Sequence, residues 1–321
     1  MIILISQMAK LKYLKKAEAK CFGFFKYPED GIASMNSFIN LCNKKQIMKK
    51  YIIFIVVLFL NTSTGLLAQN RTLKQVLELK MPKTADDELC GTRGAGVCWN
   101  TVTEKYYAAF AGNVGFPLAV FTPDGKRISS ESITTMEDIR GLWYDPIINK
   151  ILANGYGEIG WINYELDKEG IPTHYYYKFL GMNQPNEQSV AAYDARMKKI
   201  FFTDGNRVMV YENNADLFAS VKDSIQIHFG RKKSQGPGEN ELDVNYDYNT
   251  NVVATNIKDA EFGFLNTASK QIELYSYKEG YLQMTLKLPE TAPVEASFNF
   301  AYANGVYWLF DIANRKWIGY K

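Results

Sequence analysis

The sequence has few of the residues on which metal-dependent and nucleophilic enzymes most often depend. It contains two histidines in 321 residues, and both His174 and His228 lie in apolar, aromatic segments (THYYYKF and IQIHFG). A structural or catalytic zinc site needs Cys or His ligands at short spacing, and neither such a cluster nor a CxxC pair occurs. The nucleophile motif GxSxG and the glycine-rich dinucleotide motif are also missing. These absences argue against a zinc enzyme and against a Ser-His-Asp triad.

Cysteine is scarce as well, with four residues in the whole chain: Cys21, Cys42, Cys90 and Cys98. Only the last two follow the N-terminal segment that is interpreted below as a leader. In an exported chain, two nearby cysteines can close a small loop with a disulfide. Spacing alone does not establish the geometry that a disulfide requires. The sequence therefore predicts either a Cys90–Cys98 bridge or two buried thiols.

Long apolar runs are also lacking, apart from Tyr51–Leu60 (YIIFIVVLFL), which follows Met48-Lys49-Lys50. A basic start, a short apolar run and a small residue such as Ala68 are typical of a secretory signal peptide. The run is shorter than the roughly 20 residues that span a membrane, although an uncleaved signal anchor is the alternative. We predict a signal peptide at 48–68, cleaved near Ala68, and hence a periplasmic or extracellular protein. The ending LAQ resembles the export signals of Bacteroidetes-type bacteria.

Residues 1–47 carry many lysines and no repeat. We predict that translation starts at Met48, so that 1–47 is an extra leader or a mis-assigned start and 69–321 is the folded domain. The net charge is +3, but residues 1–68 hold 10 lysines and 3 acidic residues, which leaves 27 basic and 31 acidic residues and a net charge of −4. This mildly acidic remainder has no basic stripe, which argues against nucleic-acid binding. We expect a monomer without a membrane span in the mature chain.

Tyrosine (21) and phenylalanine (19) are abundant, as is typical of β-strands. The segment 189–213 contains three short apolar runs separated by turns rich in Asp, Gly and Asn, a pattern that predicts an antiparallel meander. Similar units recur, with aromatic anchors 44, 50, 53 and 54 residues apart. The anchors are Trp99, Trp143, Tyr193, Tyr246 and Phe300. This period is typical of propeller blades with four strands each.

The predicted fold is therefore an all-β propeller of four-stranded antiparallel blades. Five repeats are visible, which predicts five or six blades. The last repeat reaches Lys321 with only three strands. The missing strand can come from Leu73–Met81, with Val76–Leu79 pairing beside Trp317–Tyr320. Such a closure by the N-terminal strand avoids an open sheet edge.

Several motifs resemble NHL-type propeller repeats. Residues 201–208 (FFTDGNRV) resemble the second-to-third-strand signature of that family, and 309–315 (LFDIANR) look like a second copy. The turn at 122–126 (TPDGK) and the glycine-rich passage at 229–239 resemble further parts of such repeats. The resemblance covers about residues 73–321. It implies a propeller, and NHL-type repeats usually build six blades.

Charged residues precede most of the predicted first strands, where a propeller places them around one entrance of its central channel. They are Arg93, Arg140, Glu187, Glu239 and Glu241. Together with Tyr156, and with Trp143 and Trp161 as stacking surfaces, this mixed charge could recognise a protein, a peptide or a glycan. The alternatives are solvated rim charges and aromatic packing between blades. The leading hypothesis is a non-catalytic binding or scaffold module without a cofactor.

A second set of polar residues is expected at the ends of the second strands: Asn154, Asp204, Asn256 and Asp311. Oxygen ligands that converge near the axis could hold Ca²⁺ or another divalent ion. The alternative is that Asp and Asn simply cap tight turns. The metal reading resembles lactonase-type propellers, in which a central ion polarises a carbonyl or activates water. Its ligands here would be Asn154, Asp204, Asn256 and Glu241, and the enzyme would be a hydrolase or lyase.

Overall fold

The computed structural model describes residues 71–85, 93–212, 221–235 and 247–321, all of them within the unit Ala68–Lys321. Apart from the 3-10 turns η1 (Gly157–Ile159) and η2 (Lys233–Gln235), the regular structure is β-strand. In this described part, no helix has the length and apolar character needed to cross a membrane. The predictions for the leader and for the signal peptide fall outside the described residues and stay predictions.

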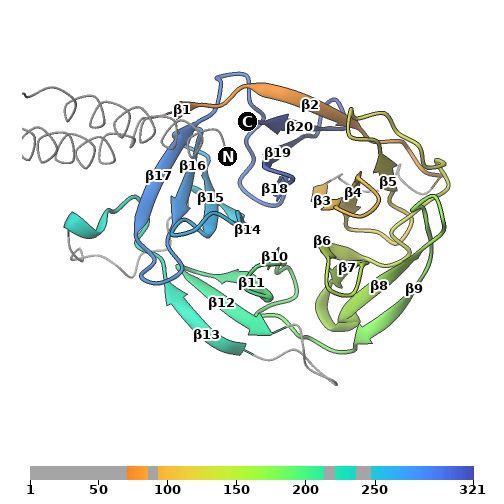
Figure 1. The fold of residues 1–321 in the computed structure, drawn as a ribbon, viewed down its shortest axis with the longest axis horizontal. Helices are drawn as coiled ribbons and strands as arrows, with labels where there is room; N and C mark the ends of the chain where they lie inside the picture. Colours follow the sequence, from red (N-terminus) through yellow and green to blue (C-terminus); the bar gives the residue numbers. More distant parts are fainter. Residues whose placement is uncertain (1–70, 86–92, 213–220, 236–246) are drawn as a thin grey trace, which may run out of the picture. The chain divides into compact units, whose positions relative to one another are not determined.

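The strands form five sheets that radiate from a common axis (Figure 1). Blade 1 consists of β3 (Arg93–Asn100), β4 (Lys105–Ala111) and β5 (Leu118–Phe121). Blade 2 consists of β6 (Ile139–Asp145), β7 (Lys150–Gly155), β8 (Trp161–Leu166) and β9 (Pro172–Phe179). Blade 3 consists of β10 (Ala192–Asp194), β11 (Lys199–Asp204), β12 (Arg207–Glu212) and β13 (Val221–Gln226). Blade 4 consists of β14 (Tyr248–Ala254), β15 (Phe262–Asn266), β16 (Gln271–Tyr275) and β17 (Leu282–Lys287).

Blade 5 is built from both ends of the unit. It consists of β18 (Phe300–Ala303), β19 (Val306–Asp311), β20 (Lys316–Tyr320) and β2 (Gln75–Lys80). The short strand β1 (Arg71–Thr72) pairs in parallel with β17 of blade 4. All other strand pairs are antiparallel. Except for β2, the strands of each blade follow chain order from the axis outward, which makes the fold an all-β propeller with five blades.

The N-terminal strand closes the ring as the sequence predicts. In the β2–β20 pair, Leu79 lies opposite Trp317 and Leu77 lies opposite Gly319. Leu79 and Trp317 are both fully buried. A Cβ on Gly94 of blade 1 would come within 2.4 Å of the Trp317 ring, so the closing blade packs directly on the first one. The pairing removes the open edge that β20 would otherwise have.

Blade 1 has three regular strands, not the four that the repeats predict. The segment after β5 pairs with that strand only through isolated bridges, such as Pro117–Thr134, and makes no regular strand. Two backbone N–H groups donate here to serine hydroxyl groups instead of to carbonyl groups of a neighbouring strand. Ser129 Oγ accepts from Val120 N at 3.0 Å, and Ser130 Oγ accepts from Ser132 N at 3.2 Å. Local side-chain acceptors of this kind compete with a continuous ladder.

The strand assignment in the fourth repeat also needs correction. From the sequence, Asn256 is expected at the end of a second strand, but the strand before it, β14 (Tyr248–Ala254), is the innermost one, and β15 is the second. The chain turns after Ala254, where Thr255 N donates to Glu261 O at 3.0 Å and Ile257 N donates to Thr255 Oγ1 at 3.2 Å. The anchor Tyr246 lies outside the described residues.

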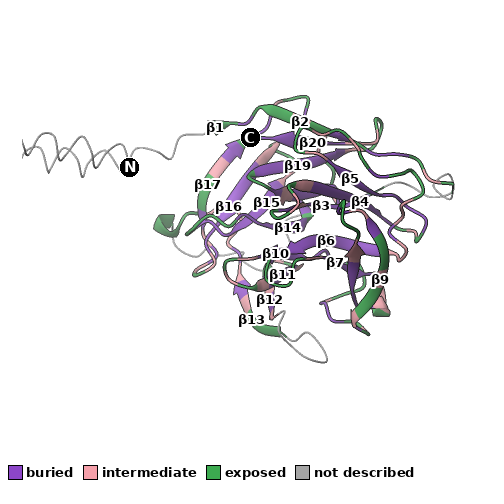
Figure 2. Cartoon of the chain, turned by 45° about the vertical axis from the view of Figure 1, so that its right-hand side comes forward, coloured by how far each residue is buried: buried purple, intermediate pink, exposed green. Residues whose placement is uncertain are grey.

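Aromatic contacts join successive blades. Phe110 of blade 1 meets Phe310 of blade 5 with ring centroids 4.9 Å apart, and Phe201 of blade 3 meets Phe262 of blade 4 at the same distance. Figure 2 shows that the inner strands are buried whereas outer strands such as β9 carry much of the exposed surface. Each blade therefore buries its faces only with the help of its neighbours, which is why the ring must be complete.

Ring closure predicts unequal effects of two substitutions in the same strand. Leu79→Ala removes a fully buried side chain and should lower the free energy of unfolding by about 2–5 kcal/mol. Val76→Ala, at a position 51% exposed, should cost less than about 1 kcal/mol. Urea denaturation followed by tryptophan fluorescence measures both. Equal effects of the two substitutions would contradict the closure.

Candidate functional site

The central channel is surrounded by the innermost strands β3, β6, β10, β14 and β18. We call the end where these strands begin the upper mouth and the end where they finish the lower mouth. Each innermost strand pairs on one side only, so its other edge presents backbone N–H and C=O groups toward the axis. A separate cavity opens at each mouth, and both are described below.

The upper cavity has a volume of about 480 Å³ and lies among the segments that lead into the innermost strands. Its charged lining residues are Arg93 and Asp204, both exposed. Aromatic and amide side chains complete the wall: Phe229, Tyr248, Phe264, Phe298, Asn186, Gln188 and Asn249. The cavity thus combines both signs of charge with aromatic surface.

Arg140 forms the centre of a polar cluster beside this cavity. Its side chain is only 7% exposed and pairs with the carboxylate of Asp138. Its Nε donates to Gln188 Oε1 at 2.8 Å, and its guanidinium lies 4.5 Å from the ring centroid of Tyr156. These contacts fix Arg140 in place, so that it positions its neighbours rather than reaching for a ligand.

Tyr156 and Glu187 join the same cluster. The hydrogen bond of the Tyr156 hydroxyl to the Glu187 side chain raises the pKa of the tyrosine above its ordinary value. The backbone adds a second link, because Gly157 N donates to Glu187 O at 3.2 Å. The structure therefore brings Arg140, Tyr156 and Glu187 together.

Phe298 connects this cluster to Arg93. The Arg93 guanidinium lies 5.7 Å from the Phe298 ring centroid, and that of Arg140 lies 6.0 Å from it. Phe298 has φ +56° and Asn299 has φ +61°, a left-handed conformation that is unfavourable for a bulky residue by about 1–3 kcal/mol. Asn249 Nδ2 donates to Phe298 O at 2.6 Å and helps to hold the strained backbone.

Phe298 also links the walls of the two cavities. It lines the upper cavity and belongs to one buried cluster with Ala95, Leu142 and Val190. Those three residues line the lower cavity, whereas Phe298 does not. The phenylalanine therefore packs between the two walls.

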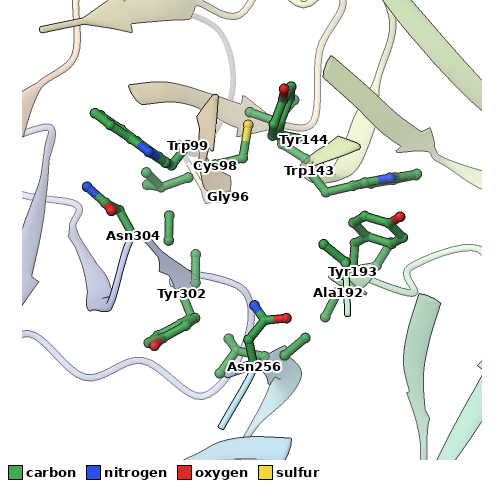
Figure 3. Close-up of a pocket in the computed structure, with 18 of the residues that line it drawn as sticks. Gly96, Cys98, Trp99, Trp143, Tyr144, Ala192, Tyr193, Asn256, Tyr302 and Asn304 are labelled. Atoms are coloured by element: carbon green, nitrogen blue, oxygen red, sulfur yellow. The ribbon is translucent and has the colours of Figure 1, made fainter. Parts of the chain in front are cut away.

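The lower cavity has a volume of about 360 Å³ and is lined by residues from all five innermost strands and the turns that follow them. Figure 3 shows Trp99 and Tyr302 on one side and Trp143 and Tyr193 on the other. Trp143, a predicted stacking residue, is thus at this cavity, but it is only 3% exposed. Trp161 is fully buried behind it, with ring centroids 5.6 Å apart, and it packs in the core.

The predicted metal ligands do not converge. Asp204 lines the upper cavity, whereas Asn256 follows an innermost strand and lines the lower one. Asn154 is fully buried and its amide is already engaged: Nδ2 donates to Gln184 Oε1 at 2.6 Å and to Ser189 O at 2.7 Å, while Oδ1 accepts from Ala191 N at 3.1 Å. Glu239 and Glu241 lie outside the described residues.

Asn154 instead ties blade 2 to blade 3, and two other asparagines have equivalent roles. Asn251 Nδ2 donates to Phe300 O at 3.1 Å, which joins blades 4 and 5. Asn299 Oδ1 accepts from Gly94 N at 2.6 Å, which joins blades 5 and 1. Buried amides of this kind satisfy backbone groups at the exposed inner edges.

The turn-capping alternative holds for several Asp residues. Asp145 Oδ1 accepts from Ile147 N at 2.9 Å, Asp194 Oδ1 accepts from Met197 N at 2.9 Å, and Asp311 Oδ1 accepts from Asn314 N at 3.1 Å. Each carboxylate bonds the backbone two or three residues later, as is usual for such turns.

Of the predicted cysteine pair, Cys98 is buried, and burial raises the pKa of its thiol. Cys90 lies outside the described residues, so the bridge stays a prediction. Sequence reasoning missed the importance of Phe298, because its partners lie about 50 to 200 residues away in the chain. It also missed the lower cavity, whose wall consists largely of unremarkable small apolar residues.

No family model and no curated protein matches the chain. Among solved structures, a glutaminyl cyclase from Myxococcus xanthus is similar, at 10% identity and a TM-score of 0.48 over 78% of this chain and 96% of the other. An auxiliary nutrient binding protein from Bacteroides thetaiotaomicron is 12% identical, with a TM-score of 0.37 over 70% of this chain and 58% of the other. A streptogramin B lyase is 15% identical, with a TM-score of 0.34 over 74% and 65%. The likeness to NHL-type repeats remains a resemblance.

The interblade role of Asn154 predicts a large loss of stability on substitution. Asn154→Leu would leave Ala191 N, Ser189 O and Gln184 without their partner, and each buried polar group left unpaired costs about 1–3 kcal/mol. We expect the free energy of unfolding to fall by roughly 3–5 kcal/mol. Gln283→Ala, which removes an exposed amide from β17, should change it by less than about 0.5 kcal/mol. Urea titration measures both, and a stable Asn154→Leu variant would refute the role.

Proposed function

We propose that this protein is an exported, non-catalytic binding module that holds a peptide segment of a partner at its upper mouth. Export rests on the signal-like sequence at 48–68. Binding rests on the upper cavity, which offers both signs of charge and aromatic surface in one place. A fold alone does not determine function, so the proposal depends on the residues of that cavity.

The observation that carries the proposal is the exposed, ring-stacked guanidinium of Arg93. Its side chain is exposed at the start of β3, and its guanidinium lies over the Phe298 ring. In the part of the chain that the structure describes, no carboxylate forms an ion pair with it. A guanidinium that is oriented by an aromatic ring and not otherwise paired is suited to a ligand carboxylate, since charge-assisted bonds of this kind are strong and directional.

The surroundings of Arg93 suit a peptide. Asp204 exposes a carboxylate on the same cavity, so a ligand with both acidic groups and N–H donors can pair with both residues. The Arg140 cluster fixes the adjacent blade connections, so that the mouth is already organised before the ligand arrives. Such preorganisation lowers the entropic cost of binding.

The alternative of a metal-dependent hydrolase or lyase gains no comparable support. It requires Asn154, Asp204, Asn256 and Glu241 to share one ion. Asp204 lines the upper cavity, whereas Asn256 lines the lower one. The amide of Asn154 already forms hydrogen bonds with Ser189 O and Ala191 N. We therefore develop only the binding function.

A tetraglutamate peptide, with tetraglutamine as its neutral counterpart, tests the role of Arg93. We expect isothermal titration calorimetry to detect binding of tetraglutamate but not of tetraglutamine. Higher salt should lower the affinity for tetraglutamate. Arg93→Gln should weaken binding by about tenfold, because a hydrogen bond to a charged group contributes about 1.5–3 kcal/mol. Arg71→Gln removes an exposed arginine on β1, away from the mouth, and should bind like the unmodified protein. Equal binding by Arg93→Gln, with an unchanged melting temperature, would contradict the proposal.

A further inference from the structure

The lower cavity has a lining that differs in kind from that of the upper one. Every Asp, Glu, Lys, Arg and His in the described part of the chain lies outside its wall. A charged ligand would lose its hydration there without gaining a counter-charge, which is strongly unfavourable. The cavity therefore selects against ions and in favour of neutral ligands.

A purely apolar ligand is also disfavoured. The wall includes the inner edges of all five innermost strands, whose outward backbone groups have no partner strand. An apolar ligand would cover these N–H and C=O groups and leave them unpaired, at a cost of about 1–3 kcal/mol each if the group becomes buried. The occupant must be neutral and must carry several hydrogen-bonding groups.

Two side-chain features narrow the chemistry further. Figure 3 shows the amide of Asn256 directed into the cavity, and this exposed amide makes no hydrogen bond within the described segments. Trp99 and Tyr302 are the partly exposed aromatic residues of the wall. Aromatic rings provide flat apolar surface beside polar groups, which matches a ligand with C–H faces and hydroxyl edges.

The volume of the lower cavity indicates a compact ligand. Phe298 lines the upper cavity and packs with Ala95, Leu142 and Val190, which line the lower one. The volume of about 360 Å³ lies in the range of small-molecule sites. A ring-shaped molecule fits this space better than an extended chain.

We infer that the lower cavity binds a neutral sugar ring. Asn256 exchanges hydrogen bonds with the hydroxyl groups, the strand edges supply further donors and acceptors, and Trp99 and Tyr302 contact the C–H face. This site is independent of the peptide site at the upper mouth. Either site can therefore fail its test without affecting the other.

Saturation-transfer NMR with D-glucose, D-galactose, N-acetyl-D-glucosamine and L-arabinose tests this inference, with D-glucuronate as a charged counterpart of glucose. Asn256 has φ +55°, so Asn256→Gly removes the amide without straining the backbone. We expect at least one neutral sugar to bind. Asn256→Gly should lower the affinity for that sugar by about fivefold to tenfold. Glucuronate should bind more weakly than glucose.

Lys198→Gly is the matched control. Lys198 is exposed, has φ +57° in the equivalent turn of blade 3 and lies outside the cavity wall. It should leave sugar binding unchanged. The inference is overturned if no neutral sugar binds, if glucuronate binds as well as glucose, or if Lys198→Gly weakens binding as much as Asn256→Gly does.

Discussion

The structure depends on the pairing of β2 with β20. Each blade covers its apolar faces only by packing against the next, so an open ring would leave two blade faces and one strand edge exposed to water. The chain solves this by bringing Leu79 opposite Trp317, about 240 residues later, and by packing Trp317 against Gly94 of the first blade. The buried asparagines that join blades near the axis, such as Asn154, supplement this closure.

Closure also creates the two cavities. The innermost strands of all five blades have no partner strand on the side of the axis, and the cavities lie at the two ends of these strands. One fold thus offers two cavities of different chemistry: a charged one that includes Arg93 and an uncharged one that includes Asn256. The strained backbone of Phe298 is held in part by Asn249 of the neighbouring blade 4.

Much of the architecture could be predicted because it is local or periodic. The incomplete last repeat indicated that Val76–Leu79 would pair beside Trp317, as β2 and β20 do. Asn256 was predicted at the end of a second strand, but it follows the innermost strand β14. The sequence did not show which apolar run of the fourth repeat is the first strand, and only the turn after Ala254 shows where that strand ends. Phe298 could not be recognised, since its role arises from contacts between distant segments.

A disulfide across the closing pair tests the closed ring most directly. Lys80 and Lys316 lie directly opposite each other in the β2–β20 ladder, at a separation that suits a disulfide. The account predicts that the double variant Lys80→Cys/Lys316→Cys forms this bridge on mild oxidation, identified by peptide mass mapping. The bridge should raise the free energy of unfolding by about 5 kcal/mol, less any strain, because it closes a very long loop. A double variant that stays reduced at these two positions, or that is no more stable than the single variants, would contradict the account.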